Sequence, residues 1–198
     1  MKLYCATINH GKLAEFRLAA ETFAERRIDL EPVPRIHEIS PFPETGAGFE
    51  ENATGKALYY GRFCEGWLFA DDSGLEVDHL GGAPGVLSAR YAGEGASDEA
   101  NNRLLLERMR GLEHRDARFV CVAALVRGGE IEGVFRGTVE GRLLEEPRGT
   151  NGFGYDPLFY FPPAGCTLAE MDGPAKLAIS HRGQALRSLF ARFVVIAR

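Results

Sequence analysis

The chain has 198 residues, of which 45% are hydrophobic and 26% charged, a composition typical of a globular protein rather than a disordered, fibrous or membrane-spanning one. Its 23 basic and 28 acidic residues give a formal net charge of −5, which excludes the wide basic surface that binding to duplex nucleic acid requires. We expect a single domain over residues 1–198, large enough to fold without disulfides or a structural metal.

The cysteines and the first residues indicate a compartment. Cys5, Cys64, Cys121 and Cys166 are far apart in the sequence and form no CxxC pair, which predicts reduced, buried thiols and no zinc site. The apolar run before Asn9 is too short for a signal peptide, and no run approaches the roughly 20 residues that cross a bilayer. We therefore expect a cytoplasmic protein that does not bind membranes.

The first 66 residues predict strand, helix, strand and helix in turn. A short apolar run over residues 3–7 precedes a helical spacing of apolar residues at Leu13, Phe16, Ala20 and Phe23. A second strand is expected over 28–33 and a proline-rich surface loop over 34–48. Apolar residues at three- and four-residue steps then predict a second helix from Phe49 that includes Cys64 and stops near Gly66.

The middle of the chain begins with a buried strand over residues 67–70. The segment Asp71-Asp72-Ser73-Gly74 predicts a polar turn that interrupts this strand before apolar alternation resumes over 75–77. A glycine-rich loop follows over 81–95. Ser97 then predicts the cap of a helix whose apolar face carries Leu104, Leu105 and Met109.

The last third predicts a hairpin, a loop and a closing helix. Strands over 119–127 and 131–139 are joined by Gly128-Gly129, and glycines also dominate the loop over 149–157. Ser180 predicts the cap of the closing helix, with a strand over 194–196 as the alternative for its last turn. Helices combined with crossover and hairpin strands indicate an α/β fold with a mixed sheet.

Thr7, Asn9 and Lys12 stand where the first strand ends and the first helix begins. Free amides at a helix start, with a hydroxyl, a side-chain amide and an ammonium group, form a seat for a polyphosphate. The alternative is a helix cap at Asn9 beside a solvated lysine. The spacing lacks the Walker pattern and so excludes an ATPase loop of that type.

The acidic candidates are Glu44, Glu50, Glu51, Asp71 and Asp72. Carboxylates, waters and substrate phosphates are the ligands that Mg²⁺ prefers, so the Asp71-Asp72 pair suggests a cation site. Adjacent residues of a strand point to opposite faces, so the two need not act together. Solvated acids in a turn are the alternative.

Gly152-Phe153-Gly154-Tyr155-Asp156 places an aromatic residue between glycines and an acid shortly after it. Such a loop can stack Phe153 on a purine while Asp156 accepts a hydrogen bond from the ring edge. The alternative is that Phe153 and Tyr155 pack into the core.

Lys176, His181 and Arg182 form a basic group near the closing helix, and Lys56 is a further cation on the second helix. An arginine fork beside a histidine suits a carbonyl or a phosphate. The alternative is an exposed helix turn with solvated charges.

Together and in this order, these segments resemble the inosine triphosphate pyrophosphatase family over nearly the whole chain. The long glycine-rich block and the SHRGQAL block are the most specific. The matching stretches are TINHGK at 7–12, ETG at 44–46, FEENATGKA at 49–57, ADDSGLEV at 70–77, GGAPGVLSARYAG at 81–93, GTNGFGYDPLF at 149–159 and AISHRGQAL at 178–186.

The resemblance implies a long mixed β-sheet flanked by helices, with two lobes around a central nucleotide-binding cleft, in a homodimer. It implies a house-cleaning enzyme that uses Mg²⁺ to split ITP, dITP or XTP into the nucleoside monophosphate and pyrophosphate. The implied partner is thus a small-molecule nucleoside triphosphate and no nucleic acid.

The resemblance also implies residue roles. Asp72 is the implied metal-binding general base, with Asp71 and Glu44 as further metal ligands. The residues implied to bind substrate are Thr7, Asn9, Lys12, Lys56, Ser73, Phe153, Gly154, Tyr155, Asp156, Lys176, His181 and Arg182. Ahead of Lys176, residues 172–175 depart from the helical, glutamate-containing run of that family.

Base selectivity follows from hydrogen-bond chemistry. Arg182 can donate to the 6-oxygen of hypoxanthine or xanthine, whereas the 6-amino group of adenine would leave it unpaired, at a cost of about 1–3 kcal/mol. Two alternatives stay open: a pyrophosphatase for other modified nucleotides, and a nucleotide-binding sensor without catalysis.

Overall fold

The computed structural model describes residues 1–24 and 27–197, and in them seven strands form one mixed sheet in the order β2-β1-β3-β4-β5-β6-β7. β1 runs parallel to β2 and β3, and all the other neighbouring strands are antiparallel. The strands are β1 (Lys2–Cys5), β2 (Asp29–Pro32), β3 (Trp67–Val77), β4 (Asp116–Arg127), β5 (Glu130–Leu143), β6 (Phe159–Phe161) and β7 (Cys166–Thr167).

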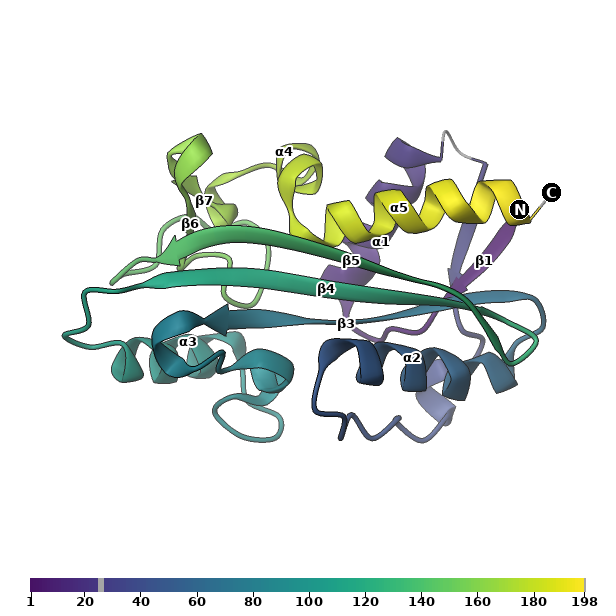
Figure 1. The fold of residues 1–198 in the computed structure, drawn as a ribbon, viewed down its shortest axis with the longest axis horizontal. Helices are drawn as coiled ribbons and strands as arrows, with labels where there is room; N and C mark the ends of the chain where they lie inside the picture. Colours follow the sequence, from purple (N-terminus) through teal and green to yellow (C-terminus); the bar gives the residue numbers. More distant parts are fainter. Residues whose placement is uncertain (25–26, 198) are drawn as a thin grey trace.

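Helices cover both faces of the sheet, and the long strands β3, β4 and β5 run through the middle of the molecule (Figure 1). α1, α4 and α5 lie on one face, and α2 and α3 on the other. The helices are α1 (His10–Phe23), α2 (Phe49–Tyr60), α3 (Asp98–Arg108), α4 (Gly173–Ile179) and α5 (His181–Ile196), and a short 3₁₀ segment, η4 (Gly85–Arg90), precedes α3. The predicted α/β fold with a mixed, helix-flanked sheet is confirmed.

Each face of the sheet has its own core because side chains alternate along a strand. On β3, Phe69 packs with Phe16 of α1 and Phe190 of α5. Its neighbour Leu68 points the other way and belongs to the core under α2, with Ala53. The same alternation continues along β3 and determines which face each polar residue of the strand reaches.

The predicted turn at Asp71-Asp72-Ser73-Gly74 is wrong, because β3 is continuous from Trp67 to Val77. In the ladder with β4, Asp71 is opposite Ala123 and Asp72 is opposite Val122. Backbone hydrogen bonds to β4 keep this polar segment extended. Each carboxylate finds polar partners on its own face, so neither has to leave the sheet.

The caps at Asn9, Ser97 and Ser180 are confirmed, since each side chain accepts a hydrogen bond from an amide in the first turn of its helix. The hairpin of β4 and β5 is also confirmed and is longer than predicted.

Two boundaries differ from the prediction: α2 ends at Tyr60, so Cys64 lies beyond it, and η4 interrupts the expected loop over 81–95. The predicted closing helix is confirmed, since α5 remains helical through Ile196, and the alternative of a strand over 194–196 is wrong.

The segment that departs from the expected pattern ahead of Lys176 still forms a helix, α4. Asp172 caps it, with its Oδ1 accepting from the Ala175 amide at 2.8 Å. Pro174 is tolerated in the first turn because its missing N–H has no intrahelical partner there. The sequence patterns did not predict α4, β6 or β7, which have seven, three and two residues.

The four cysteines are unpaired, as predicted, although only Cys5 and Cys121 are buried and Cys64 and Cys166 are partly exposed. No helix in the described part of the chain is long and apolar enough to cross a membrane.

Two glycines allow the first turn of α5 to lie against β5 and against α4. A Cβ at Gly137 would overlap the His181 carbonyl oxygen and lie 2.8 Å from the Ala185 nitrogen. A Cβ at Gly183 would overlap the Leu177 carbonyl group in the same way. These close approaches fix where His181 and Arg182 stand relative to the sheet.

We predict that Gly137→Ala lowers the free energy of unfolding by about 1–3 kcal/mol, because the methyl group forces α5 away from β5. Urea unfolding followed by circular dichroism measures this. Gly61→Ala is the control, because Gly61 has φ −59° and a Cβ there meets only Val126 Cγ2 at 3.4 Å. Equal stability of Gly137→Ala and the wild type would contradict the close packing.

Candidate active site

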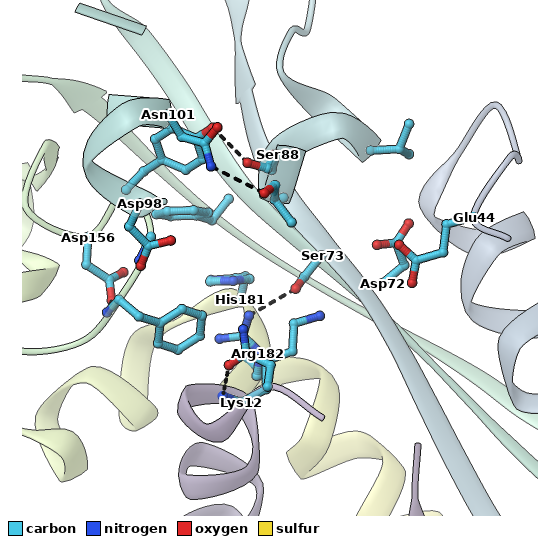
Figure 2. Close-up of a pocket in the computed structure, with 18 residues that line it drawn as sticks. Lys12, Glu44, Asp72, Ser73, Ser88, Asp98, Asn101, Asp156, His181 and Arg182 are labelled. Atoms are coloured by element: carbon cyan, nitrogen blue, oxygen red, sulfur yellow. Dashed lines mark hydrogen bonds between the residues drawn. The ribbon is translucent and has the colours of Figure 1, made fainter. Parts of the chain in front are cut away.

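A pocket opens between β3, η4 and α3 on one side and the first turns of α1 and α5 on the other (Figure 2). The loop over residues 149–157, called the base loop below, forms part of its wall. Most of the predicted site residues line it: Asn9, Lys12, Glu44, Asp72, Ser73, Phe153, Gly154, Tyr155, Asp156, His181 and Arg182.

A second hollow adjoins this pocket and shares Asn9, Lys12 and Glu44 with it. Thr7 and Lys56 line this second hollow. Of the predicted residues, only Asp71 and Lys176 line neither space; both are buried directly behind residues that do. The two spaces together form one cleft with a cationic end and an aromatic end.

Asp71 faces α1, on the side of the sheet away from Asp72. Its Oδ2 accepts hydrogen bonds from Lys12 Nζ at 2.8 Å and Ser73 Oγ at 3.1 Å. Burial alone would raise the pKa of this carboxyl, but the charges of Lys12 and Arg182 outweigh burial and hold the pKa at about 2. Asp71 is therefore ionised under all physiological conditions and neutralises Lys12.

Asp72 faces α2, where Asn52 Nδ2 donates to its Oδ2 at 2.9 Å. Burial raises its pKa to about 6, and the nearby negative charges of Glu44 and Asp71 contribute in the same direction. A carboxyl with a pKa near neutrality, open to a pocket, is suited to accept a proton from water.

Glu44 lies beside Asp72 at the junction of the two spaces (Figure 2). Lys56 Nζ donates to Glu44 Oε1 at 2.7 Å, and Arg90 Nη2 donates to the Glu44 backbone oxygen at 2.9 Å. Burial would lower the pKa of Lys56, but the charges of Glu44 and Asp71 raise it, so the lysine is a cation. These contacts hold the Glu44 carboxylate at the edge of the pocket.

The Glu44 and Asp72 carboxylates fit a magnesium ion that is completed by substrate. Mg²⁺ is usually bound by one or two carboxylates together with waters and substrate phosphates, and not by an all-protein cage. Among the described residues no cluster of three or more histidines, cysteines or acids could hold a metal by itself. The donor set therefore suits an ion that arrives with a phosphate.

At the other end of the cleft, Arg182 is buried and held from two sides. Its Nη1 donates to Glu15, and its Nη2 donates to Ser73 Oγ at 2.9 Å. Glu15 Oε1 also pairs with Lys176 at 2.7 Å, and Lys176 donates to Asp156. Lys176 and Arg182 lower the pKa of Glu15 against the effect of burial. These alternating charges fix the guanidinium plane at the pocket wall.

The aromatic residues of this end take different positions. Phe153 lines the pocket with Lys176 Nζ 5.1 Å and Arg182 Cζ 5.3 Å from its ring centre. Tyr155 is buried in the core, as the alternative reading of this loop predicted, and its hydroxyl donates to the Ser88 carbonyl at 2.8 Å. The Phe153 side chain thus remains on the pocket wall while Tyr155 anchors the loop.

His181 is a neutral imidazole in this pocket. Its ring stacks on Phe119, with centres 4.7 Å apart and planes 10° from parallel. Burial and the charge of Arg182 hold its pKa well below the usual value. Its Nδ1 is buried and has no hydrogen-bond partner among the described residues, so it is available to a ligand.

The sequence patterns missed four polar residues that hold the site: Glu15, Asn52, Arg90 and Asp98. Asn52 left a signal, because it is a polar residue three positions after Phe49 on the apolar side of α2, and both side chains are buried. Glu15 lies one helical turn after Lys12. The other two are polar residues in segments predicted as a loop and a helix start, where nothing local marks them.

Comparison with known proteins shows that the chain is similar to nucleotide pyrophosphatases. The profile of the Ham1 family matches residues 3–192. A dITP/XTP pyrophosphatase from Acidobacterium capsulatum is 48% identical over 201 residues, covering 97% of this chain and 98% of its own. Another protein of that name, from an Exiguobacterium species, is 47% identical, with 98% and 97% covered.

Solved structures agree with these sequences. A HAM1 protein from Coxiella burnetii superposes with a TM-score of 0.87 at 38% identity, over 98% of this chain and 99% of that chain. A nucleoside-triphosphatase, dITP/XTP pyrophosphatase, from Mycobacterium abscessus superposes with a TM-score of 0.74 at 42% identity, over 96% and 97%.

We predict that, without divalent cations, Asp72→Asn raises the free energy of unfolding at pH 7.5 by about 1–3 kcal/mol. The folded state holds the Asp72 pKa at about 6, above its ordinary value of 3.8, so ionisation above pH 6 costs stability. The gain should shrink at pH 4.5, where the folded protein keeps this carboxyl protonated. Urea unfolding in EDTA at both pH values measures it.

Asp71→Asn is the matched comparison and has the opposite sign. A folded-state pKa of about 2 stabilises the protein at every pH above 3.8, and this contribution is lost as the pH falls through 2. We expect the variant to lose about 2 kcal/mol at pH 7.5. Changes of the same sign in both variants would contradict the assignment of the two carboxylates.

Proposed function

The chain belongs to the Ham1 family, and we propose on that basis that it hydrolyses deaminated purine nucleoside triphosphates such as ITP, dITP and XTP to the monophosphate and pyrophosphate. The observation that carries the proposal is the single cleft that joins an acid pair, Glu44 and Asp72, to an aromatic and arginine-lined end. The resemblance to inosine triphosphate pyrophosphatases predicted from the sequence is confirmed by the family match.

The cationic end suits the triphosphate. Lys12 and Lys56 line it, and the first turn of α1 presents backbone amides beside Asn9. Each lysine is already paired with a carboxylate, so it is held in place before substrate arrives. A net charge of −5 on the chain is no obstacle, because the substrate meets these cations and the magnesium ion that it brings.

Asp72 is the proposed general base. Its carboxyl has a pKa of about 6, opens to the pocket, and is oriented by Asn52. It accepts a proton from a water molecule as that water attacks the α-phosphorus, and pyrophosphate leaves on the opposite side. Glu44 and Asp72 would hold Mg²⁺, which would neutralise phosphate charge when bound. Asp71 stays a predicted ligand, although its Oδ2 is occupied by Lys12 and Ser73.

The aromatic end suits a 6-keto purine. Phe153 offers a ring face, and Arg182, which also lines the pocket, is fixed by Glu15 and Ser73. Arg182 can donate to a 6-oxygen, whereas adenine has an amino donor at that position, which favours ITP and XTP over ATP. His181 supplies a further unpaired ring nitrogen.

The homodimer and the cytoplasmic location stay predictions from the resemblance and the composition. The alternatives of a sensor and of a pyrophosphatase for other modified nucleotides are distinguished by the reaction itself, as follows.

We predict that the protein releases pyrophosphate from ITP and XTP at least tenfold faster than from ATP at limiting substrate, and dUTP and GTP in the same panel test the alternative of a pyrophosphatase for other nucleotides. A coupled pyrophosphate assay with chromatography of the monophosphate measures both products. Asp72→Asn should lower kcat by about a hundredfold or more, because it removes the proton acceptor. ITP binding without pyrophosphate release would indicate a sensor, and equal rates on ITP and ATP would contradict the selectivity.

We predict that Glu44→Gln raises the Mg²⁺ concentration that gives half-maximal activity by about tenfold, because a carboxylate ligand becomes a neutral amide. Glu94→Gln is the control, since Glu94 pairs with the same arginine, Arg90, but its side chain is 89% exposed. An unchanged Mg²⁺ requirement in Glu44→Gln would rule out Glu44 as a ligand.

A further inference from the structure

We propose that Asp98 and Asn102, in the first turns of α3, are positioning residues that hold the base loop in its nucleotide-binding position. The inference rests on the proposed function and deepens it, because it names what places Phe153 for the purine. Neither residue belongs to the roles that the sequence resemblance implied.

Both backbone groups of Gly154, at the tip of the loop, are bonded to α3. The Gly154 amide donates to Asp98 Oδ2 at 2.6 Å, and Asn102 Nδ2 donates to the Gly154 carbonyl oxygen at 3.0 Å. Asp98 and Asn102 are four residues apart, so they are neighbours on one face of α3. Together they hold the two peptide groups that flank the Gly154 Cα.

The preceding amide is held by a different carboxylate. The Phe153 amide donates to Asp156 Oδ2 at 2.9 Å, and Asp156 is bound in turn by Lys176 of α4. Figure 2 shows Asp98 and Asp156 at the same end of the pocket. Two successive amides are therefore fixed by acids attached to elements on opposite faces of the sheet, and the Phe153 Cα, which carries the ring, lies between these two amides in the chain.

Packing alone does not hold this loop. Phe153, Gly154 and Asp98 line the nucleotide pocket and also a separate, outer hollow on the other side of the loop. The loop is thus a thin wall with space on both sides. The start of the loop is held by hydrogen bonds from Thr150 and Asn151 to the Ala169 carbonyl, and its tip at Gly154 is held by the hydrogen bonds to α3.

The helix α3, which carries Asp98 and Asn102, is itself held in place by hydrogen bonds. Ser97 caps α3 through the Ala100 amide, and the buried Asn101 donates to the Ala89 carbonyl and accepts from the Ala92 amide. These bonds tie α3 to η4. A displacement of Gly154 relative to α3 therefore requires breaking the Asp98 and Asn102 contacts themselves.

The test combines kinetics with hydrogen exchange on the full-length protein. We expect Asp98→Ala and Asn102→Ala each to raise KM for ITP by five- to fiftyfold, with kcat changed less than threefold, because the acids at the other end of the cleft are untouched. Asp98→Asn keeps an acceptor oxygen and should recover most of the affinity. Asn102 does not line the nucleotide pocket, so its effect must act through the loop.

Glu99→Ala is the matched control. Glu99 is the neighbouring acid in the same helical turn and is exposed to solvent, and within the described part of the chain it makes no hydrogen bond to the base loop. It reproduces the loss of one negative charge at the start of α3. Its KM should remain within twofold of the wild type, and thermal unfolding of all the variants separates misfolding from a local change.

Hydrogen exchange of a peptide covering residues 149–158 measures the hydrogen bonding between the base loop and α3, and this measurement needs no substrate. Exchange should be faster in Asp98→Ala and Asn102→Ala than in the wild type, and unchanged in Glu99→Ala. Unchanged exchange in the first two would overturn the proposal whether or not the protein hydrolyses ITP. Faster exchange with unaltered KM would overturn the positioning role, whereas a wild type inactive on every triphosphate would overturn the proposed function alone.

Discussion

The site depends on one constraint, the alternation of side chains along an uninterrupted strand. Asp71 and Asp72 are neighbours in sequence, yet β3 directs them to opposite faces of the sheet. Their surroundings then give the two carboxyls different pKa values. Asp71 lies among cations and stays ionised, whereas Asp72 is buried beside an amide and a second acid. A turn at this point would have left both carboxyls in solvent, with ordinary pKa values and no difference in their roles.

Pairing of opposite charges also holds the cations of the cleft in place. Lys12, Lys56 and Arg182 are each matched by a carboxylate, in Asp71, Glu44 and Glu15 respectively. Cations fixed in this way need little rearrangement when a phosphate tail or a keto group arrives, which is how a preorganised polar site favours a charged transition state. The matching acids come from three different elements, so the arrangement exists only in the folded chain.

Local signals were enough for much of the fold. The caps at Asn9, Ser97 and Ser180 and the paired glycines of the hairpin act within a few residues, and motif order along the chain identified the family. Three features were not accessible in this way. The polar centre of β3 is held extended by pairing with residues 50 positions away, α4 is too short for a periodic pattern, and Glu15 acquires its partners through the packing of α1 on α4 and α5. These are tertiary effects, which override local preference.

The distribution of the cysteines has a practical consequence. Cys5 and Cys121 are sealed in the sheet under α1 and α5, where burial raises each thiol pKa to about 12, while Cys64 and Cys166 reach the surface. Since only the thiolate is nucleophilic, alkylating reagents will modify the outer pair in the native protein and reach the inner pair only when the sheet opens. The rate at which Cys5 and Cys121 are alkylated therefore reports global unfolding, and mass spectrometry can follow it without an introduced label.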